Sequence, residues 1–167
     1  MKLDIKGIAI LAFIAGILAF FLLAPAGGIK AAPAITLQTI DGQAIELEKL
    51  KGKPYLMVFW ATDCPSCVEE IPHLIDLQQK LQDTGFRTIG VAMPHDEESA
   101  IKAMRQQKGM QYDLAYDKTG EWGQAFGGIK VTPTSFLVSP EGKITRMQLG
   151  SFDFAELEQQ IRAMLKG

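Results

Sequence analysis

The sequence predicts an α/β domain of three layers, in which a central mixed β-sheet carries helices on both faces. Two observations lead to this fold class. Continuous apolar runs, typical of buried strands, alternate with segments whose apolar residues recur every three or four positions, as in amphipathic helices. Near the carboxyl end, two strand-like segments stand so close together that they must pair antiparallel, whereas the strand–helix–strand units before them favour a layered α/β arrangement.

The predicted elements begin with a small hairpin, which pairs Ile35–Leu37 with Ala44–Leu47 across an Asp41-Gly42 turn. Further strands are expected at residues 55–60, 86–93, 134–138 and 144–149. Helices are expected at residues 65–82, 96–108, 119–126 and 152–165. Pro72 lies inside the first of these helices and predicts a kink there.

The composition disfavours several functional classes. The chain has 167 residues and a formal net charge of −2, and it has no basic stripe of the kind that binds nucleic acid. Its two cysteines, Cys64 and Cys67, stand three residues apart, and a bridge across so short a loop restricts the unfolded chain little. A zinc site on this pair would need two further ligands, whereas His73 and His95 each stand alone. We therefore expect redox chemistry and no metal site.

An uncharged apolar segment precedes the domain. Residues 7–29 contain no charged side chain, and at ~1.5 Å per residue they would form a helix of roughly 35 Å, enough to cross a bilayer core of ~30 Å. Lys2 and Lys6 favour a cytoplasmic N-terminus. Ala24-Pro25-Ala26 leaves open a cleaved signal peptide, which would also place the domain outside the cytoplasm. The expected organisation is a cytoplasmic N-terminus at 1–6, a single transmembrane anchor at 7–29, a linker at 30–34 and an extracytoplasmic domain at 35–167.

The two cysteines lie where a buried strand is predicted to end and a helix to begin. A helix N-terminus carries about half a positive charge and free N–H groups, and both stabilise a thiolate. Pro65 follows Cys64 at the first helical position, where proline fits best, and Cys67 follows one turn later on the same side. The pattern predicts that Cys64 attacks a partner disulfide and that Cys67 then resolves the mixed disulfide. The Cys64–Cys67 disulfide would be the redox group, and no cofactor is expected.

These residues resemble thioredoxin-like proteins, in particular the TlpA/ResA branch of membrane-anchored thiol–disulfide oxidoreductases. The similarity is carried by Phe59–Cys67, Glu70–Pro72 and Val131–Leu137, and it covers roughly Pro33 to the carboxyl end. The resemblance implies a thioredoxin-like fold, with Cys64 as the attacking cysteine and Cys67 as the resolving one.

The resemblance also implies supporting roles for four residues. Pro133 matches the family's cis-proline beside the active site, and Thr132 and Trp60 complete the predicted substrate-binding residues. Glu70 would lie near the cysteines and relay protons to them. From the residues alone, Glu70 could instead be an exposed acid that favours the helix dipole, and Thr132-Pro133 an ordinary loop.

Two positions depart from the family pattern. Many relatives carry a tryptophan directly before the first cysteine, whereas this chain has Asp63, whose carboxylate would disfavour a nearby thiolate. Cytoplasmic thioredoxins bury an aspartate two residues before the position of Trp60, where this chain has Val58. A proton relay therefore cannot use that position, and both departures leave the reduction potential and the partner open.

The resemblance implies an enzyme that reduces disulfides of partner proteins outside the cytoplasm, for example in cytochrome c maturation or a related envelope pathway. Its electrons would come from a membrane-embedded thiol donor. Three alternatives stay open: a disulfide oxidant or isomerase, a copper-handling metallochaperone on the same fold, and a binding module without redox chemistry. The metallochaperones usually need a further histidine near the cysteines, and none follows His95.

Overall fold

The structure of the protein is a computed structural model that describes residues 31–166. The predicted cytoplasmic segment and membrane anchor, residues 1–6 and 7–29, lie outside this range. Within the described range, no helix is both long enough and apolar enough to cross a membrane.

Five strands form the central sheet, in the spatial order β5–β4–β3–β6–β7. These strands are β3 (Tyr55–Trp60), β4 (Arg87–Ala92), β5 (Asp113–Tyr116), β6 (Thr134–Val138) and β7 (Ile144–Leu149). Strand β4 is parallel to both β3 and β5, whereas β6 is antiparallel to both β3 and β7. The predicted mixed sheet is therefore confirmed, and every residue of its central strand β3 is buried.

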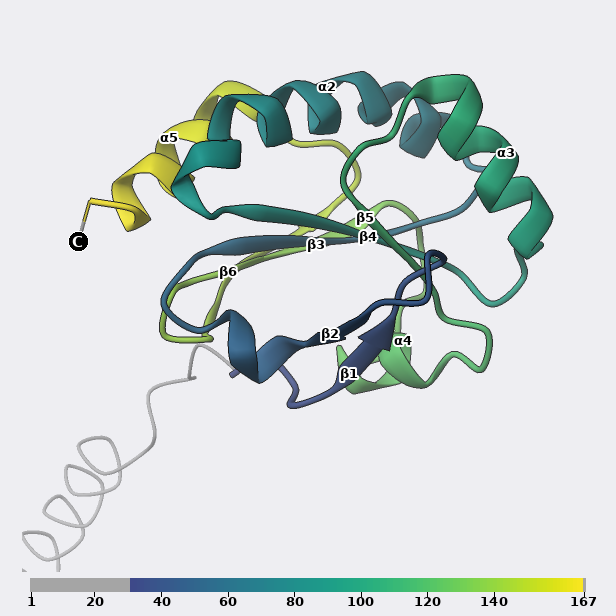
Figure 1. Ribbon diagram of the computed structural model, residues 1–167, viewed down its shortest axis with the longest axis horizontal. Coiled ribbons are helices and arrows are strands. Elements are labelled where there is room, and N and C mark those ends of the chain that lie inside the picture. The colour runs from purple at the N-terminus through teal and green to yellow at the C-terminus, as the bar shows by residue number, and fades with distance from the viewer. Residues whose placement is uncertain (1–30, 167) are drawn as a thin grey trace, which may run out of the picture.

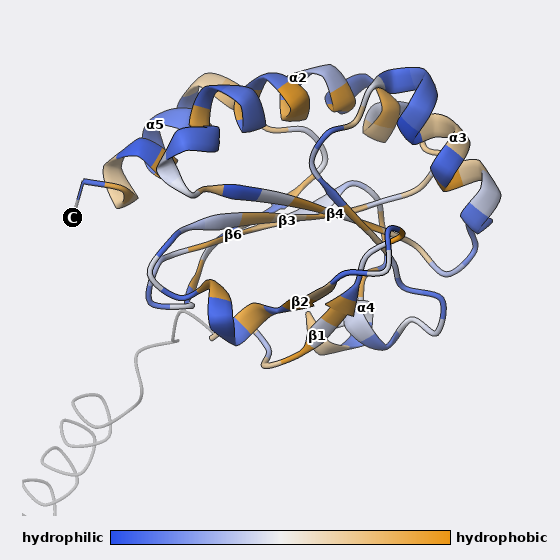
Figure 2. Cartoon of the chain, viewed as in Figure 1, coloured by the Kyte–Doolittle hydropathy of each residue, from blue (hydrophilic) through white to orange (hydrophobic). Residues whose placement is uncertain are grey.

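Helices and the hairpin cover the two faces of the sheet (Figure 1). One face carries α2 (Pro65–Leu81), α3 (Glu98–Lys108) and α5 (Phe154–Met164). The other face carries the short helix α4 (Glu121–Ala125), the hairpin of β1 (Thr36–Gln38) and β2 (Ala44–Glu46), and the 3₁₀ helix η1 (Leu47–Leu50). A second 3₁₀ turn, η2 (Gln82–Thr84), follows α2. The outer surfaces of α2 and α5 are largely hydrophilic, whereas the central strands are largely apolar (Figure 2).

Strand β5 is the one element of the sheet that the sequence analysis did not predict. It has four residues and lies at the edge of the sheet, where it pairs with β4. Its central residues Leu114 and Ala115 are fully buried, and Ala115 also forms a bridge to Thr39 beside the hairpin. A run this short shows no usable periodicity, so its strand conformation depends on partners that are distant in the sequence.

The sheet separates two apolar clusters, and β3 contributes alternate side chains to each because successive residues of a strand point to opposite faces. Leu56, Val58 and Trp60 join the cluster beneath α2, α3 and α5. Tyr55, Met57 and Phe59 join the cluster beneath the hairpin and α4. Trp60 is thereby placed at the carboxyl end of β3, on the face that also holds Cys67.

Candidate active site

Cys64 and Cys67 form a disulfide at the junction between β3 and α2. Cys64 is the N-cap of the helix, and its Sγ accepts a hydrogen bond from the Cys67 backbone N–H at 3.3 Å. The Ser66 hydroxyl lies 3.5 Å from the same sulfur. Cys67 is 3% exposed, whereas Cys64 is half-buried. The sulfur that a partner can reach is therefore Cys64, and the donors around it favour a thiolate there.

The loop before β6 lies against this disulfide. The Thr132 carbonyl oxygen is 3.5 Å from Cys64 Sγ, and the Thr132–Pro133 peptide bond is cis, as the resemblance implied. The Pro133 carbonyl accepts a hydrogen bond from the Gly150 N–H at 2.8 Å, which ties the loop to the end of β7. Thr132 is partly exposed beside Cys64, and a role of Thr132 and Pro133 in binding substrate stays a prediction.

Trp60 lies in the core on the inner side of the cysteine pair. It is 3% exposed, and its indole Nε1 has no hydrogen-bond partner within the described part of the chain. With Cys67, Glu70 and Tyr112 it lines a narrow cavity of about 10 Å³, close to the ~10–15 Å³ that one water molecule needs. The indole thus faces the resolving cysteine, and a role of Trp60 in binding substrate stays a prediction.

Gly90 on β4 makes room for this arrangement. A Cβ atom at Gly90 would lie 2.8 Å from Leu114 Cδ2 and 3.2 Å from Trp60 Nε1. We expect Gly90→Ala to lower the free energy of unfolding by about 1–3 kcal/mol, because a methyl group would overpack the core there. Urea denaturation of the disulfide-bonded protein measures this loss. Gly123→Ala is the matched control, because a Cβ at that buried glycine would meet its neighbours at 3.4 Å or more. Equal stability of the two variants would contradict the expectation.

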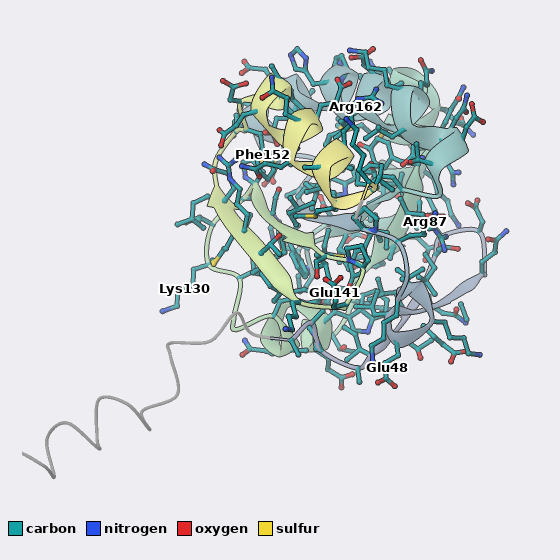
Figure 3. All side chains as sticks on the ribbon, turned by 90° about the vertical axis from the view of Figure 1, so that its left-hand side faces the viewer. Glu48, Arg87, Lys130, Glu141, Phe152 and Arg162 are labelled. Atoms are coloured by element: carbon teal, nitrogen blue, oxygen red, sulfur yellow. A yellow bond between two sulfur atoms is a disulfide. The ribbon has the colours of Figure 1, made fainter. Side chains whose placement is uncertain are left out.

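Glu70 lies one helical turn after Cys67 and is buried, with 3% of its surface exposed. Its Oε1 accepts a hydrogen bond from the Phe152 N–H at 3.1 Å. Phe152 lies just before α5 begins (Figure 3). Burial raises the pKa of Glu70 above its ordinary value, although hydrogen bonds from Phe152 and Ser151 and the charge of His73 oppose the rise. The interpretation of Glu70 as an exposed helix acid is therefore wrong, whereas the neighbouring Glu69 is exposed.

Among the described residues that line the cavity, Glu70 is the only carboxylate, and Val58 stands where cytoplasmic thioredoxins bury an aspartate. Besides Glu70 and Cys67, Tyr112 is the ionisable residue that lines the cavity. Burial, with a smaller contribution from the charge of Glu70, raises the pKa of Tyr112, so its phenol stays protonated. Glu70 is therefore the carboxyl group placed in the same cavity as Cys67, and its role as a proton relay stays a prediction.

The sequence analysis missed three contributors to the site. Gly90 and Tyr112 reach the cavity from β4 and from the residue before β5, and no local pattern connects them to the cysteines. Ser66 was passed over as a spacer, although a hydroxyl inside a Cys-x-x-Cys turn is a signal that the sequence does contain. Among residues 31–166, no group of three His, Cys, Asp or Glu side chains is arranged to hold a metal ion.

Comparison with known proteins agrees with this geometry. The family model Redoxin matches residues 28–161. The chain belongs to the Redoxin family. The thiol-disulfide oxidoreductase ResA of Bacillus thuringiensis subsp. konkukian is 33% identical over 134 residues, which cover 80% of this chain and 76% of that protein. ResA of Bacillus anthracis is 33% identical over 138 residues, which cover 82% of this chain and 76% of that protein.

A solved structure supports the same assignment. The thiol:disulfide interchange protein of the thioredoxin family from Chlorobium tepidum TLS aligns with a TM-score of 0.75 and 29% identity, covering 83% of this chain and 97% of that one. This Redoxin-family chain is therefore a thiol–disulfide oxidoreductase of the TlpA/ResA type with a thioredoxin-like fold. Its Cys-x-x-Cys pair is Cys64 and Cys67, which form a disulfide in the structure.

Proposed function

We propose that this oxidoreductase is anchored in the bacterial cytoplasmic membrane by residues 7–29, with its domain on the extracytoplasmic side, and reduces disulfides of partner proteins there. The observation that carries the proposed exchange is the difference in exposure and surroundings between the two sulfurs. Cys64 is accessible at a helix N-terminus, whereas Cys67 is buried against a carboxyl group whose pKa is raised. This arrangement suits one nucleophile and one resolving thiol.

The reaction follows from the assignment of Cys64 as the nucleophile and Cys67 as the resolving thiol. The Cys64 thiolate attacks one sulfur of the partner disulfide, so that a Cys64–partner bond forms and the second partner sulfur leaves as a thiolate and takes up a proton. The Cys67 thiolate then attacks Cys64 Sγ, and the partner's first sulfur leaves in the same way. Two electrons and two protons have passed from the cysteine pair to the partner, and the chain carries the Cys64–Cys67 disulfide that the structure contains.

Glu70 acts in the second step. Cys67 must lose its proton before it can attack, and it is too buried for bulk water to accept that proton directly. Glu70 lines the same cavity, and burial moves its pKa upward, toward neutral pH. A general base works best when its pKa is near the working pH. The cavity volume of about 10 Å³ is at the lower end of the ~10–15 Å³ that one water molecule needs, and a water there would let the proton pass from the thiol to the carboxylate.

The proposed location and direction of the reaction follow from the N-terminal segment and the resemblance. The uncharged residues 7–29, with Lys2 and Lys6 before them, favour a single span with the domain outside. Resemblance to the TlpA/ResA branch favours reduction over oxidation, with partners such as those of cytochrome c maturation or a related envelope pathway. Each turnover leaves an oxidised pair, so the chain needs a donor of two electrons, and we propose a membrane-embedded thiol protein.

Trapping of thiols in intact cells tests the proposed direction. Cells that carry the full chain are quenched in acid and treated with a maleimide of high mass, and the mobility of the chain then reports the state of Cys64 and Cys67. We expect a mainly reduced pair. A fully oxidised pair at steady state would indicate an oxidant and contradict the proposal. Digestion of the domain by a protease added to spheroplasts, with a cytoplasmic protein left intact, tests the location in the same cells.

A further inference from the structure

Two loops beside Cys64 are joined by partly buried hydrogen bonds. The Thr62 N–H, in the turn between β3 and α2, donates to both carboxylate oxygens of Asp96 at 3.0 and 3.2 Å. The Thr62 hydroxyl also donates to this carboxylate. Asp96 lies in the loop between β4 and α3 and is 5% exposed, and its carbonyl accepts from the Tyr116 hydroxyl at 2.7 Å. The Met93 N–H donates to the Trp60 carbonyl at 3.0 Å, so the two loops are fixed relative to each other.

This contact sets the next residue of each loop against its counterpart. Asp63 follows Thr62 and His95 precedes Asp96, and His95 Nε2 lies 3.4 Å from Asp63 Oδ1. Both side chains are exposed, at 75% for Asp63 and 55% for His95. An ion pair this exposed is ordinarily weak and poorly ordered. Here the hydrogen bonds from Thr62 to Asp96 and from Met93 to Trp60 hold both backbones in place. The carboxylate directly before the nucleophile therefore has an imidazole as its partner.

We propose that His95 is a positioning residue for the reaction of Cys64. His95 orients the Asp63 carboxylate and, when protonated, cancels the negative charge that opposes a thiolate on the next residue. With this charge cancelled, Cys64 reacts faster than it would beside an Asp63 carboxylate that has no partner. The inference rests on the proposed exchange at Cys64, and it makes the net charge beside the nucleophile depend on whether His95 carries a proton.

The other ionisable groups on these elements are already accounted for. The Asp96 carboxylate is bound by Thr62, and Glu98 pairs with Lys102 at 2.5 Å. Glu97 is exposed at the start of α3, and the Tyr116 hydroxyl is bound to the Asp96 carbonyl. The first turn of α2 contains no acidic side chain. Asp63 is thus the carboxylate nearest to Cys64 in the chain, and His95 is its ion-pair partner.

The test measures how fast the reduced full-length chain, purified in mild detergent, reacts with iodoacetamide between pH 5 and 8. This reagent is uncharged, and mass spectrometry of peptides identifies the modified cysteine as Cys64. We expect His95→Gln to slow the reaction about two- to five-fold below pH 6.5 and to leave it unchanged at pH 8. Asp63→Asn should accelerate the reaction by a similar factor at pH 8 and have little effect at pH 5.5.

Two further variants separate this role from a general effect of substitution. In the Asp63→Asn background, His95→Gln should have no more than half of its original effect, because the charge that it cancels is gone. His95→Lys, a permanent cation, should restore the rate at low pH and raise it at pH 8. His73→Gln is the matched control, because His73 lies on the outer face of α2 against Phe154.

Superimposable pH profiles of His95→Gln and the unchanged chain would overturn the inference. So would full additivity of the two substitutions, or an equal effect of His73→Gln. Alkylation needs no partner disulfide, so the outcome is separate from the proposed function. If the pair were fully oxidised in cells while the Asp63–His95 coupling was present, the proposed direction would fail and this inference would stand.

Discussion

Cys64→Ser should abolish thiol–disulfide exchange, reducing the rate by roughly 10³-fold or more to the uncatalysed background, as removal of a nucleophile generally does. Cys64 Sγ is the sulfur that a partner can reach, because Cys67 is 3% exposed. A serine hydroxyl stays protonated in the place where the cysteine forms a thiolate. Reduction of insulin disulfides, with dithiothreitol as the electron source, measures the loss.

Cys67→Ser provides the matched control, because it removes the second sulfur and leaves the first in place. This variant should still attack but cannot resolve, so it accumulates as a mixed disulfide that non-reducing electrophoresis detects. If Cys64→Ser kept a tenth of the activity, or if Cys67→Ser trapped no partner, the assignment of attacking and resolving roles would be wrong.

Glu70→Gln should slow the release of the partner about 10²-fold near pH 6.5, since general acid–base groups contribute roughly 10²–10⁴-fold to a rate. The amide keeps the shape of the side chain and can still accept the Phe152 hydrogen bond, but it cannot take the proton of Cys67. The deficit should shrink as pH rises, because hydroxide increasingly replaces the missing base. Stopped-flow measurement of the decay of a preformed mixed disulfide follows this step alone.

The charge of Glu70 has an opposite effect, since a carboxylate near Cys67 disfavours a second negative charge. A variant that released its partner faster at every pH would mean that this repulsion outweighs proton transfer, and would exclude the relay. Glu69→Gln is the control, because Glu69 is an exposed carboxylate on the same helix and should have no such effect.

Stability provides an independent check on Glu70. Its pKa is raised in the folded protein, so the folded state binds more protons than the unfolded state between the two pKa values. The free energy of unfolding contributed by this group is therefore greatest below the unfolded pKa and is lost as pH rises through the folded pKa. Relative to Glu70→Gln, the unchanged chain should become less stable over that interval, which urea denaturation at several pH values measures.

Local patterns predicted most of the fold because the relevant forces act between near neighbours in the chain. The apolar run of β3, the amphipathic repeat of α2 and the Asp41-Gly42 turn each carry their own signal, and the structure has all three elements. The ends of the elements differ by one or two residues; for example, α5 begins at Phe154 instead of residue 152. Strand β5 could not be predicted, because its conformation depends on hydrogen bonds to β4.

The cysteine chemistry was likewise visible in the sequence, because spacing and helix placement alone put Cys64 at an N-cap and Cys67 one turn later. The resemblance also implied that Glu70 and the Thr132–Pro133 loop lie beside the pair, but the contacts that hold them there were not visible. The burial of Glu70 depends on Phe152, 82 residues away, whose N–H donates a hydrogen bond to one of the carboxylate oxygens. The inward position of Trp60 depends equally on the missing side chain of Gly90.

By itself, then, the sequence determined the strand-to-helix junction, the redox pair and the order of the main elements, since each follows from contacts within a few residues. Only the tertiary structure decided how far each sulfur is exposed and that Glu70 is buried with a raised pKa. It also decided that Asp63 lies beside His95, on two loops that hydrogen bonds hold together. Those properties depend on desolvation and on charges brought together from separate segments. No spacing along the chain encodes them, because they arise when segments that are distant in the sequence pack together.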